Sequence, residues 1–564
     1  MTPDQAMRAR QAAALLNQRR FAEAADLLAP LASTLPGEAD IRHLLGAALA
    51  GAGDAVGAER ALRGALTINA GHAHAAVDLA RLLAAQDRHE DLLAATEAAA
   101  AAERPRLALL DQRAKALQAL DRTAEALAVR ERQVGLAPDN PAVHHNLAAL
   151  LGDMGQAERA EAAARTAFMR GGDAPETWLA LARALQKQTR YDEADAAFAE
   201  VLKRRPLDLE ALRDQAQLVW MRTGDADAAC ARLDRMIAER PDVSALRALK
   251  AKVLTYAGDP RGAYAAMTAG PLTDAAGNLA ASRVAVAFDA DRALEHARTA
   301  VAMAPEQQDV RRGLVEALLA VGAAAEAAPM VEAMLRQRPL DQYLLALQAT
   351  VWRLLDDPRQ AQLYDYAAMV RGWRIDTPDG WPDLDSYLAE LAGTLRGLHR
   401  LKTHPLDQSL RHGTQTSMDL LVSEEPTVRA FFKAIDGPIR RHMEMLGQGD
   451  DPLRRRNTGA YRIKGAWSVQ LQPDGFHADH LHPDGWLSSA CYIALPDAVE
   501  GAGREGWIQF GRPGIPTAPS LEAQHFIKPE PGLLALFPSC MWHGTVPFSG
   551  DQTRLTIAFD VVPA

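Results

Sequence analysis

The chain has 564 residues, of which 48% are hydrophobic and 24% are charged, and its formal net charge is −10. That length is too great for one hydrophobic core, so several domains, or a repeat array with a domain attached, are expected. The net charge is mildly negative, and the basic residues are not gathered into one region of the sequence. Both observations argue against nucleic acid and anionic membranes as partners. The sequence contains no signal-peptide core and no run of about eighteen apolar residues, so a cytoplasmic protein outside the membrane is expected.

The first two thirds of the chain are rich in alanine, which favours packed helical hairpins. Helix-breaking or turn residues recur there at separations close to about 34 residues or twice that, the period of tetratricopeptide repeats, each of which is a helix–turn–helix unit. These positions are Pro36, Asn69, Pro105, Pro138, Pro206, Pro241, Pro305 and Pro339.

The clearest unit runs from Ala174 to Pro206. Its small residues Ala182 and Ala194 let two helices touch, while Trp178 and Phe198 fill the seam between them. Stacked units build a superhelix whose concave face is a natural groove for a peptide or protein. We therefore predict a helical array over residues 1–355 that binds a peptide or protein substrate, with spacing or self-association into a homo-oligomer as the alternative roles.

The alanine-rich periodicity fades after about Leu355, and Trp, Pro, Gly and His become frequent. Residues 356–450 are predicted to form a helical linker and support region, with one helix at 425–448 covering a sheet. Residues 451–564 contain short β-rich runs separated by Gly and Pro, which suit a small double-sheet jelly roll of the cupin kind. These runs are GAWSVQLQ, WLSSACYIALP, GWIQFG, GLLALFP and RLTIAFDVV.

Four candidate metal ligands lie within six residues, His477, Asp479, His480 and His482. In a strand, residues two apart point to the same side, so His480 and His482 form one pair and His477 and Asp479 form another that faces the other way. Extended geometry cannot give one metal all four ligands. His543, which follows a later β-rich run, is the candidate third ligand for either pair.

Arg554 and Thr556 share one face of the last predicted strand. The guanidinium and the hydroxyl could together bind a carboxylate. Three ligands on one side of an iron(II) ion leave the opposite positions open for a keto acid and dioxygen, and a cation must then hold the far carboxylate of that keto acid.

The tail from about Asp407 to Ala564 resembles the 2-oxoglutarate and iron(II)-dependent oxygenases that follow tetratricopeptide repeats in bacterial proteins. The matching strings are LRHGTQT, GAWSVQL, HLHPDGWLSSACYIALP, FPSCMWHGTVPF and TRLTIAFD. The resemblance implies a double-stranded β-helix with flanking helices behind the all-α array. It also implies a dioxygenase that hydroxylates its substrate and releases succinate and carbon dioxide.

By that resemblance His480, His482 and His543 would hold iron(II), and Arg554 would bind the C5 carboxylate of 2-oxoglutarate. The wider superfamily uses His-x-Asp or His-x-Glu, which literally falls on His477 and Asp479 and keeps that pair as the alternative. The HLHP string, which matches this subfamily, favours the histidines.

Trp467, Ser488 and Tyr492 lie on predicted strands that should flank the metal, so we expect them to contact the keto acid or the substrate. The function expected is hydroxylation of a side chain of a peptide or protein bound by the repeats. Two alternatives remain open: a metal-binding scaffold without turnover, and an oxygenase that acts on a small molecule.

Overall fold

The structure is a computed structural model that describes residues 1–564. The chain folds into two compact units, Met1–Leu185 and Gln186–Ala564. No helix in it is both long enough and apolar enough to cross a bilayer.

The first unit consists of helices that pair as antiparallel hairpins. Close approach within one hairpin depends on Gly46, because a Cβ atom there would lie 2.6 Å from Cγ of Leu62 on the facing helix. The helices are α1 (Pro3–Asn17), α2 (Phe21–Thr34), α3 (Ala39–Gly51), α4 (Ala55–Ile68), α5 (Ala73–Ala84), α6 (His89–Ala95), α7 (Glu97–Ala101), α8 (Leu107–Ala119), α9 (Thr123–Leu136), α10 (Pro141–Asp153), α11 (Ala157–Met169) and α12 (Pro175–Lys187), the last of which crosses the border between the units.

The second unit begins with more helices of the same kind, which confirms the predicted all-α repeat array. They are α13 (Tyr191–Arg204), α14 (Leu209–Thr223), α15 (Ala226–Glu239), α16 (Ser244–Tyr256), α17 (Pro260–Thr268), α18 (Ala275–Ala285), α19 (Ala290–Met303), α20 (Gln308–Ala320), α21 (Ala324–Gln337) and α22 (Gln342–Leu354). The predicted border at residue 355 falls one residue after α22 ends.

Two antiparallel sheets follow, which confirms the predicted jelly-roll class. The six-stranded sheet has the order β1-β7-β4-β9-β3-β2, and the three-stranded sheet has the order β6-β5-β8. The strands are β1 (Arg371–Arg374), β2 (Leu410–Gln415), β3 (Tyr461–His477), β4 (Leu487–Ala494), β5 (Ile508–Phe510), β6 (His525–Ile527), β7 (Leu533–Pro538), β8 (His543–Thr545) and β9 (Arg554–Pro563). The sheets share one core, in which the rings of Phe510 and Phe537 lie 5.0 Å apart.

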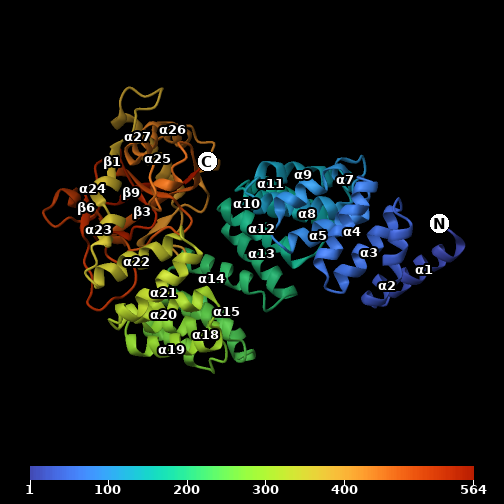
Figure 1. The fold of residues 1–564 in the computed structure, drawn as a ribbon. Coiled ribbons are helices and arrows are strands. Elements are labelled where there is room, and N and C mark those ends of the chain that lie inside the picture. The colour runs from blue at the N-terminus through green and yellow to red at the C-terminus, as the bar shows by residue number, and fades with distance from the viewer. The chain divides into compact units, whose positions relative to one another are not determined.

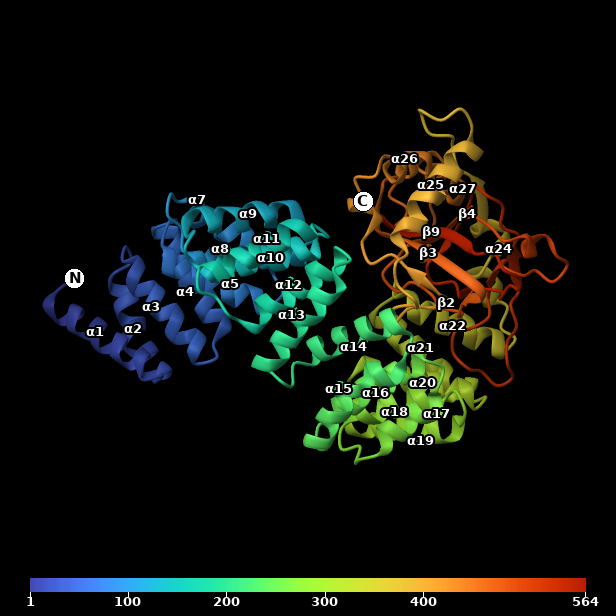
Figure 2. The same ribbon diagram turned by 180° about the vertical axis from the view of Figure 1, so that it is seen from behind.

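Residues 356–450 differ from the expected helical support because they also supply the two edge strands β1 and β2 of the large sheet. The short helices α23 (Arg359–Leu363) and α24 (Tyr366–Met369) precede β1. The predicted helix at 425–448 is two helices, α26 (Pro426–Ala434) and α27 (Asp436–Leu446). They break because Pro438 has no N–H to donate to the carbonyl of Ala434. Together with α25 (Leu384–Leu398) they cover one side of the large sheet (Figures 1 and 2).

The last repeat helix packs directly on the β-domain. Thr350 of α22 accepts a hydrogen bond from the indole N–H of Trp542 at 3.0 Å, and Arg353 donates to the carbonyl oxygens of Gly511 and Glu522, each at 2.8 Å. Trp542 is 3% exposed, so these contacts belong to a buried interface. Residue Trp542 immediately precedes His543, and the helical array therefore reaches to within one residue of the candidate metal site.

Candidate metal centre and its cavity

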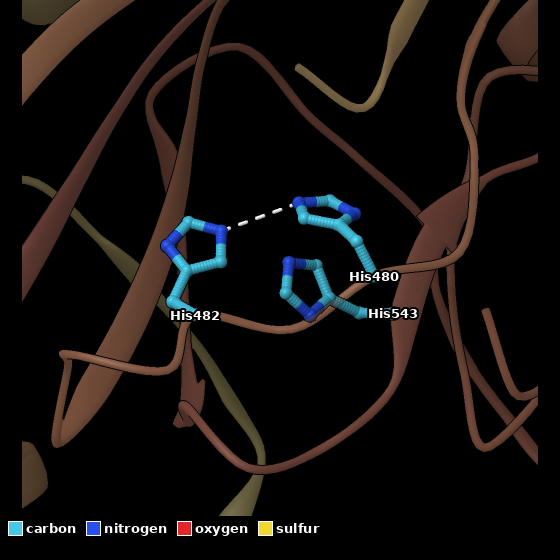
Figure 3. A group of neighbouring side chains, drawn as sticks. All are labelled: His480, His482 and His543. Carbon is cyan, nitrogen blue, oxygen red and sulfur yellow. Dashed lines mark hydrogen bonds between the residues drawn. The ribbon is translucent and has the colours of Figure 1, made fainter. Parts of the chain in front are cut away.

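His480, His482 and His543 lie together (Figure 3), in the wall of a cavity that strands of both sheets line. Their ligand nitrogens are all within 4.8 Å of one another, and the Nε2 atoms of His480 and His482 are 3.2 Å apart. Two backbone hydrogen bonds between His480 and His543, of 2.8 and 2.9 Å, fix the distance between these two residues. The three residues are therefore close enough together to hold a metal ion.

Each of the three imidazoles is oriented through its Nδ1 atom. His480 donates to the carbonyl of Ala478 at 2.9 Å, and His543 donates to the carbonyl of Met541 at 3.0 Å. His482 donates to the carboxylate of Asp560 at 2.6 Å. With the proton on Nδ1, the lone pair of each ring is on Nε2, the atom that faces the other two rings. A histidine that binds a metal through one ring nitrogen usually donates the N–H of the other to a carbonyl or carboxylate in this way.

Two of the three imidazoles, those of His480 and His543, are held in the neutral form. Burial, and after it the neighbouring His482, lower the pKa of His480 to about 3. Burial also lowers the pKa of His543 well below its ordinary value, with His480 and His482 acting in the same direction. Neutral imidazole is the form that binds a metal, and imidazole suits iron, zinc, copper and nickel alike. The donor set therefore fits the iron(II) that the sequence analysis expects.

The alternative pair, His477 and Asp479, does not join this group. Asp479 accepts hydrogen bonds from the amide of Gln509 at 2.9 and 3.2 Å and lies 3.5 Å from Nε of Arg512. Burial raises the pKa of this carboxyl to about 6. The Nδ1 atom of His477 lies 2.9 Å from the hydroxyl of Ser409, which is also 3.2 Å from Nε2 of His480. His477 is thus a neighbour of the group, and Asp479 turns toward β5.

Arg554 is a buried cation without an anionic partner. The residue is 2% exposed, no carboxylate lies within ion-pair distance, and its Nε has no hydrogen-bond acceptor. Its Cζ lies 5.0 Å from the centre of the Tyr492 ring. Burial lowers the pKa of Arg554, because removing a guanidinium from water disfavours its charge. An unpaired cation in such a place is costly, and an anionic ligand would offset the cost.

A cavity of about 470 Å³ contains both the histidine group and Arg554. Of the residues predicted to bind the co-substrate, Thr556 and Trp467 also line it, and the Trp467 ring stacks on His482 with centroids 5.9 Å apart. Ser488 lies behind the cavity, where its hydroxyl donates to Asp560 at 3.1 Å. Tyr492 is fully buried behind Arg554. These two side chains therefore support the residues that face the cavity.

Several residues that line the cavity were not predicted from the sequence, among them Asp560, Ser409 and Tyr256. Asp560 had a signal, since it lies at an even spacing from Arg554 and Thr556 along β9 and thus on the same face. Ser409 and Tyr256 had none, because one precedes a strand that was not predicted and the other belongs to a repeat helix.

Comparisons with known proteins agree with this architecture. Residues 465–560 match the family model described as "Putative 2OG-Fe(II) oxygenase". Residues 175–206 and 287–351 match two tetratricopeptide repeat models. No curated protein matches the chain.

Solved structures of repeat proteins resemble parts of the chain at low identity. A tetratricopeptide repeat protein from Parabacteroides merdae is 16% identical over 49% of this chain and 97% of its own, with a TM-score of 0.36. The protein TTC0263 from Thermus thermophilus is 24% identical over 32% of this chain and 98% of its own, with a TM-score of 0.26. Similarity at this level says nothing about a ligand. The chain therefore carries tetratricopeptide repeats and, behind them, a C-terminal domain that matches the 2OG-Fe(II) oxygenase family model.

Proposed function

We propose that the C-terminal domain is an iron(II)- and 2-oxoglutarate-dependent dioxygenase. His480, His482 and His543 would hold the iron through Nε2, and Arg554 with Thr556 would bind the C5 carboxylate of 2-oxoglutarate. One observation carries the proposal: a single cavity is lined by three imidazoles whose ligand nitrogens converge and by a buried guanidinium without an anionic partner.

Bound iron(II) would supply the redox chemistry by which dioxygen, 2-oxoglutarate and the substrate yield succinate, carbon dioxide and the hydroxylated substrate. The protein's share is positioning. Asp560 holds the proton of His482 on Nδ1 and places a negative charge close to a site whose three ligands are all neutral. Trp467, stacked on His482, would shield that side of the metal site from water.

The substrate we propose is a side chain of a peptide or protein bound by the repeats. Tetratricopeptide arrays present extended concave surfaces, and the repeat helix α16 contributes Tyr256 to the cavity wall. A cytoplasmic location is part of the same proposal, since Cys230, Cys491 and Cys540 are all unpaired and thiols stay reduced in that compartment.

An anaerobic titration of the full chain with Fe(II) and 2-oxoglutarate tests the proposal. A weak visible charge-transfer band is expected for the wild-type protein, and it should be absent in Arg554→Ala and in His543→Ala. The control Arg512→Ala, which removes a half-exposed guanidinium outside this cavity, should keep the band. Tight binding of zinc with no band under any condition would favour a metal-binding scaffold instead.

A further inference from the structure

The cavity has a second guanidinium that the proposed chemistry does not use. Only two basic side chains, Arg554 and Arg411, line it. Every acidic side chain in its wall already has a partner: Asp407 with Lys252 at 2.8 Å, Asp479 with Gln509 at 2.9 Å, Asp484 with Lys464 at 3.5 Å and Asp560 with His482 at 2.6 Å. Neither guanidinium has a carboxylate within ion-pair distance, and 2-oxoglutarate would neutralise only one of the two.

Arg411, on the edge strand β2, keeps donor groups free. Its NH1 group donates to the carbonyl oxygens of Gln408 and Leu410, each at 2.8 Å. No carboxylate lies within ion-pair distance of it, and its Nε and NH2 groups make no hydrogen bond to the protein. Because the residue is only half-buried, these groups are accessible from the cavity. A planar fork of this kind is suited to a carboxylate.

The repeat array holds Arg411 in place. The guanidinium lies over the ring of Tyr256, the last residue of α16, with Cζ 4.9 Å from the ring centre. Lys252, one turn earlier on α16, pairs with Asp407. The backbone N–H groups of Lys402 and Thr403 donate to the carbonyl of Met221 on α14. The segment that leads into β2 is thus fixed to two repeat helices before it reaches the cavity.

We propose that Arg411, supported by Tyr256, binds a carboxylate of the substrate, so that the substrate is an acid. The carboxylate could be an Asp or Glu side chain of a peptide or the acid group of a free small molecule, and the experiment below separates these sources. The inference rests on the proposed function, which assigns Arg554 to the co-substrate. Tyr256 is a positioning residue, because it acts through Arg411.

Binding to the full-length protein tests the inference in the presence of saturating 2-oxoglutarate and Mn(II), which keep Arg554 occupied. In one arm, a random nonapeptide library is selected on the protein, and the bound pool is sequenced. In the other arm, calorimetry compares N-acetylaspartate with N-acetylasparagine. We expect acidic residues enriched at one position of the bound peptides, or N-acetylaspartate bound about tenfold tighter than its amide, the effect of one charge-assisted contact. No preference for the acid in either arm would overturn the inference.

Substitutions at Arg411 and Tyr256 test whether Arg411 causes the preference for the acid. Arg411→Gln should abolish it, whereas Arg411→Lys should keep part of it. Tyr256→Phe should behave as the wild type, and Tyr256→Ala should weaken the preference, because only the ring is needed to support the guanidinium. An acid preference unchanged in a folded Arg411→Gln variant would contradict the assignment. Failure of the proposed function would show separately, as loss of the charge-transfer band, which does not depend on any substrate.

Discussion

The Nδ1 atom of His482 lies 2.6 Å from Oδ1 of Asp560, on the same strand that carries Arg554. A neutral amide in place of this carboxylate would still accept the hydrogen bond but would remove the charge behind the imidazole. We expect Asp560→Asn to weaken metal binding by about 10- to 100-fold, the usual effect of losing such a partner. Titration with Co(II), followed by absorption, measures the change.

Ser488→Ala is the control for that experiment, because Ser488 donates to the same carboxylate and leaves its charge in place. Its effect on metal affinity should be clearly smaller. Equal affinities for the wild type and Asp560→Asn would show that Asp560 only orients the ring.

Arg554 makes the protein's stability sensitive to its proposed co-substrate. At about 100 times its Kd, a ligand of the folded state adds about 2.7 kcal/mol to the free energy of unfolding. We therefore expect 2-oxoglutarate to raise the Tm of the wild type and of Arg512→Met, but not of Arg554→Met. Without ligand, Arg554→Met should be at least as stable as the wild type, since it removes an unpaired buried cation. Thermal melts with and without 2-oxoglutarate decide both points.

Asp479 gives the fold a specific pH dependence. Burial raises the pKa of its carboxyl from 3.8 to about 6, so the folded protein holds a proton that the unfolded chain releases. This difference in proton binding adds to the free energy of unfolding. The added stability is fully present below pH 3.8 and is lost as the pH rises through 6. Above that pH the ionised carboxylate costs at most about 3 kcal/mol.

Asp479→Asn should therefore be more stable than the wild type at pH 7, with the difference vanishing near pH 4. Urea unfolding at several pH values measures it, with the exposed Asp484→Asn as the control. The same variant should bind metal as the wild type does. A loss of metal affinity would instead restore the pair of His477 and Asp479 as the ligands.

Thr350 connects the last repeat to the metal site. Thr350→Val keeps the shape of the side chain but leaves the buried indole N–H of Trp542 without an acceptor, which should cost about 1–3 kcal/mol of stability. The control is Thr255→Val, because the hydroxyl of Thr255 makes only a bond within its own helix, to Ala251. Equal urea midpoints for the two variants would mean that the Trp542 contact contributes nothing.

The regular parts of the protein could be predicted from sequence because they repeat. The alanine-rich period indicated the helices, and alternation along β9 placed Arg554 and Thr556 on one face. The interpretation was incomplete where a residue's role depends on a distant segment. Ser409 reaches His480 only because β2 pairs with β3, and Ser488 turned out to bind Asp560 rather than line the cavity. No local pattern carries such information.

Trp542 and His543 are adjacent in sequence, yet the first side chain is held by a repeat helix and the second faces the metal group. This limits how such a protein can be recombined, in evolution or by design. A chimaera that joined the β-domain to another helical array at residue 356 would lack α22. The side chain of Trp542, which α22 contacts, would then be exposed next to the histidines. The transferable unit must carry α22 with it.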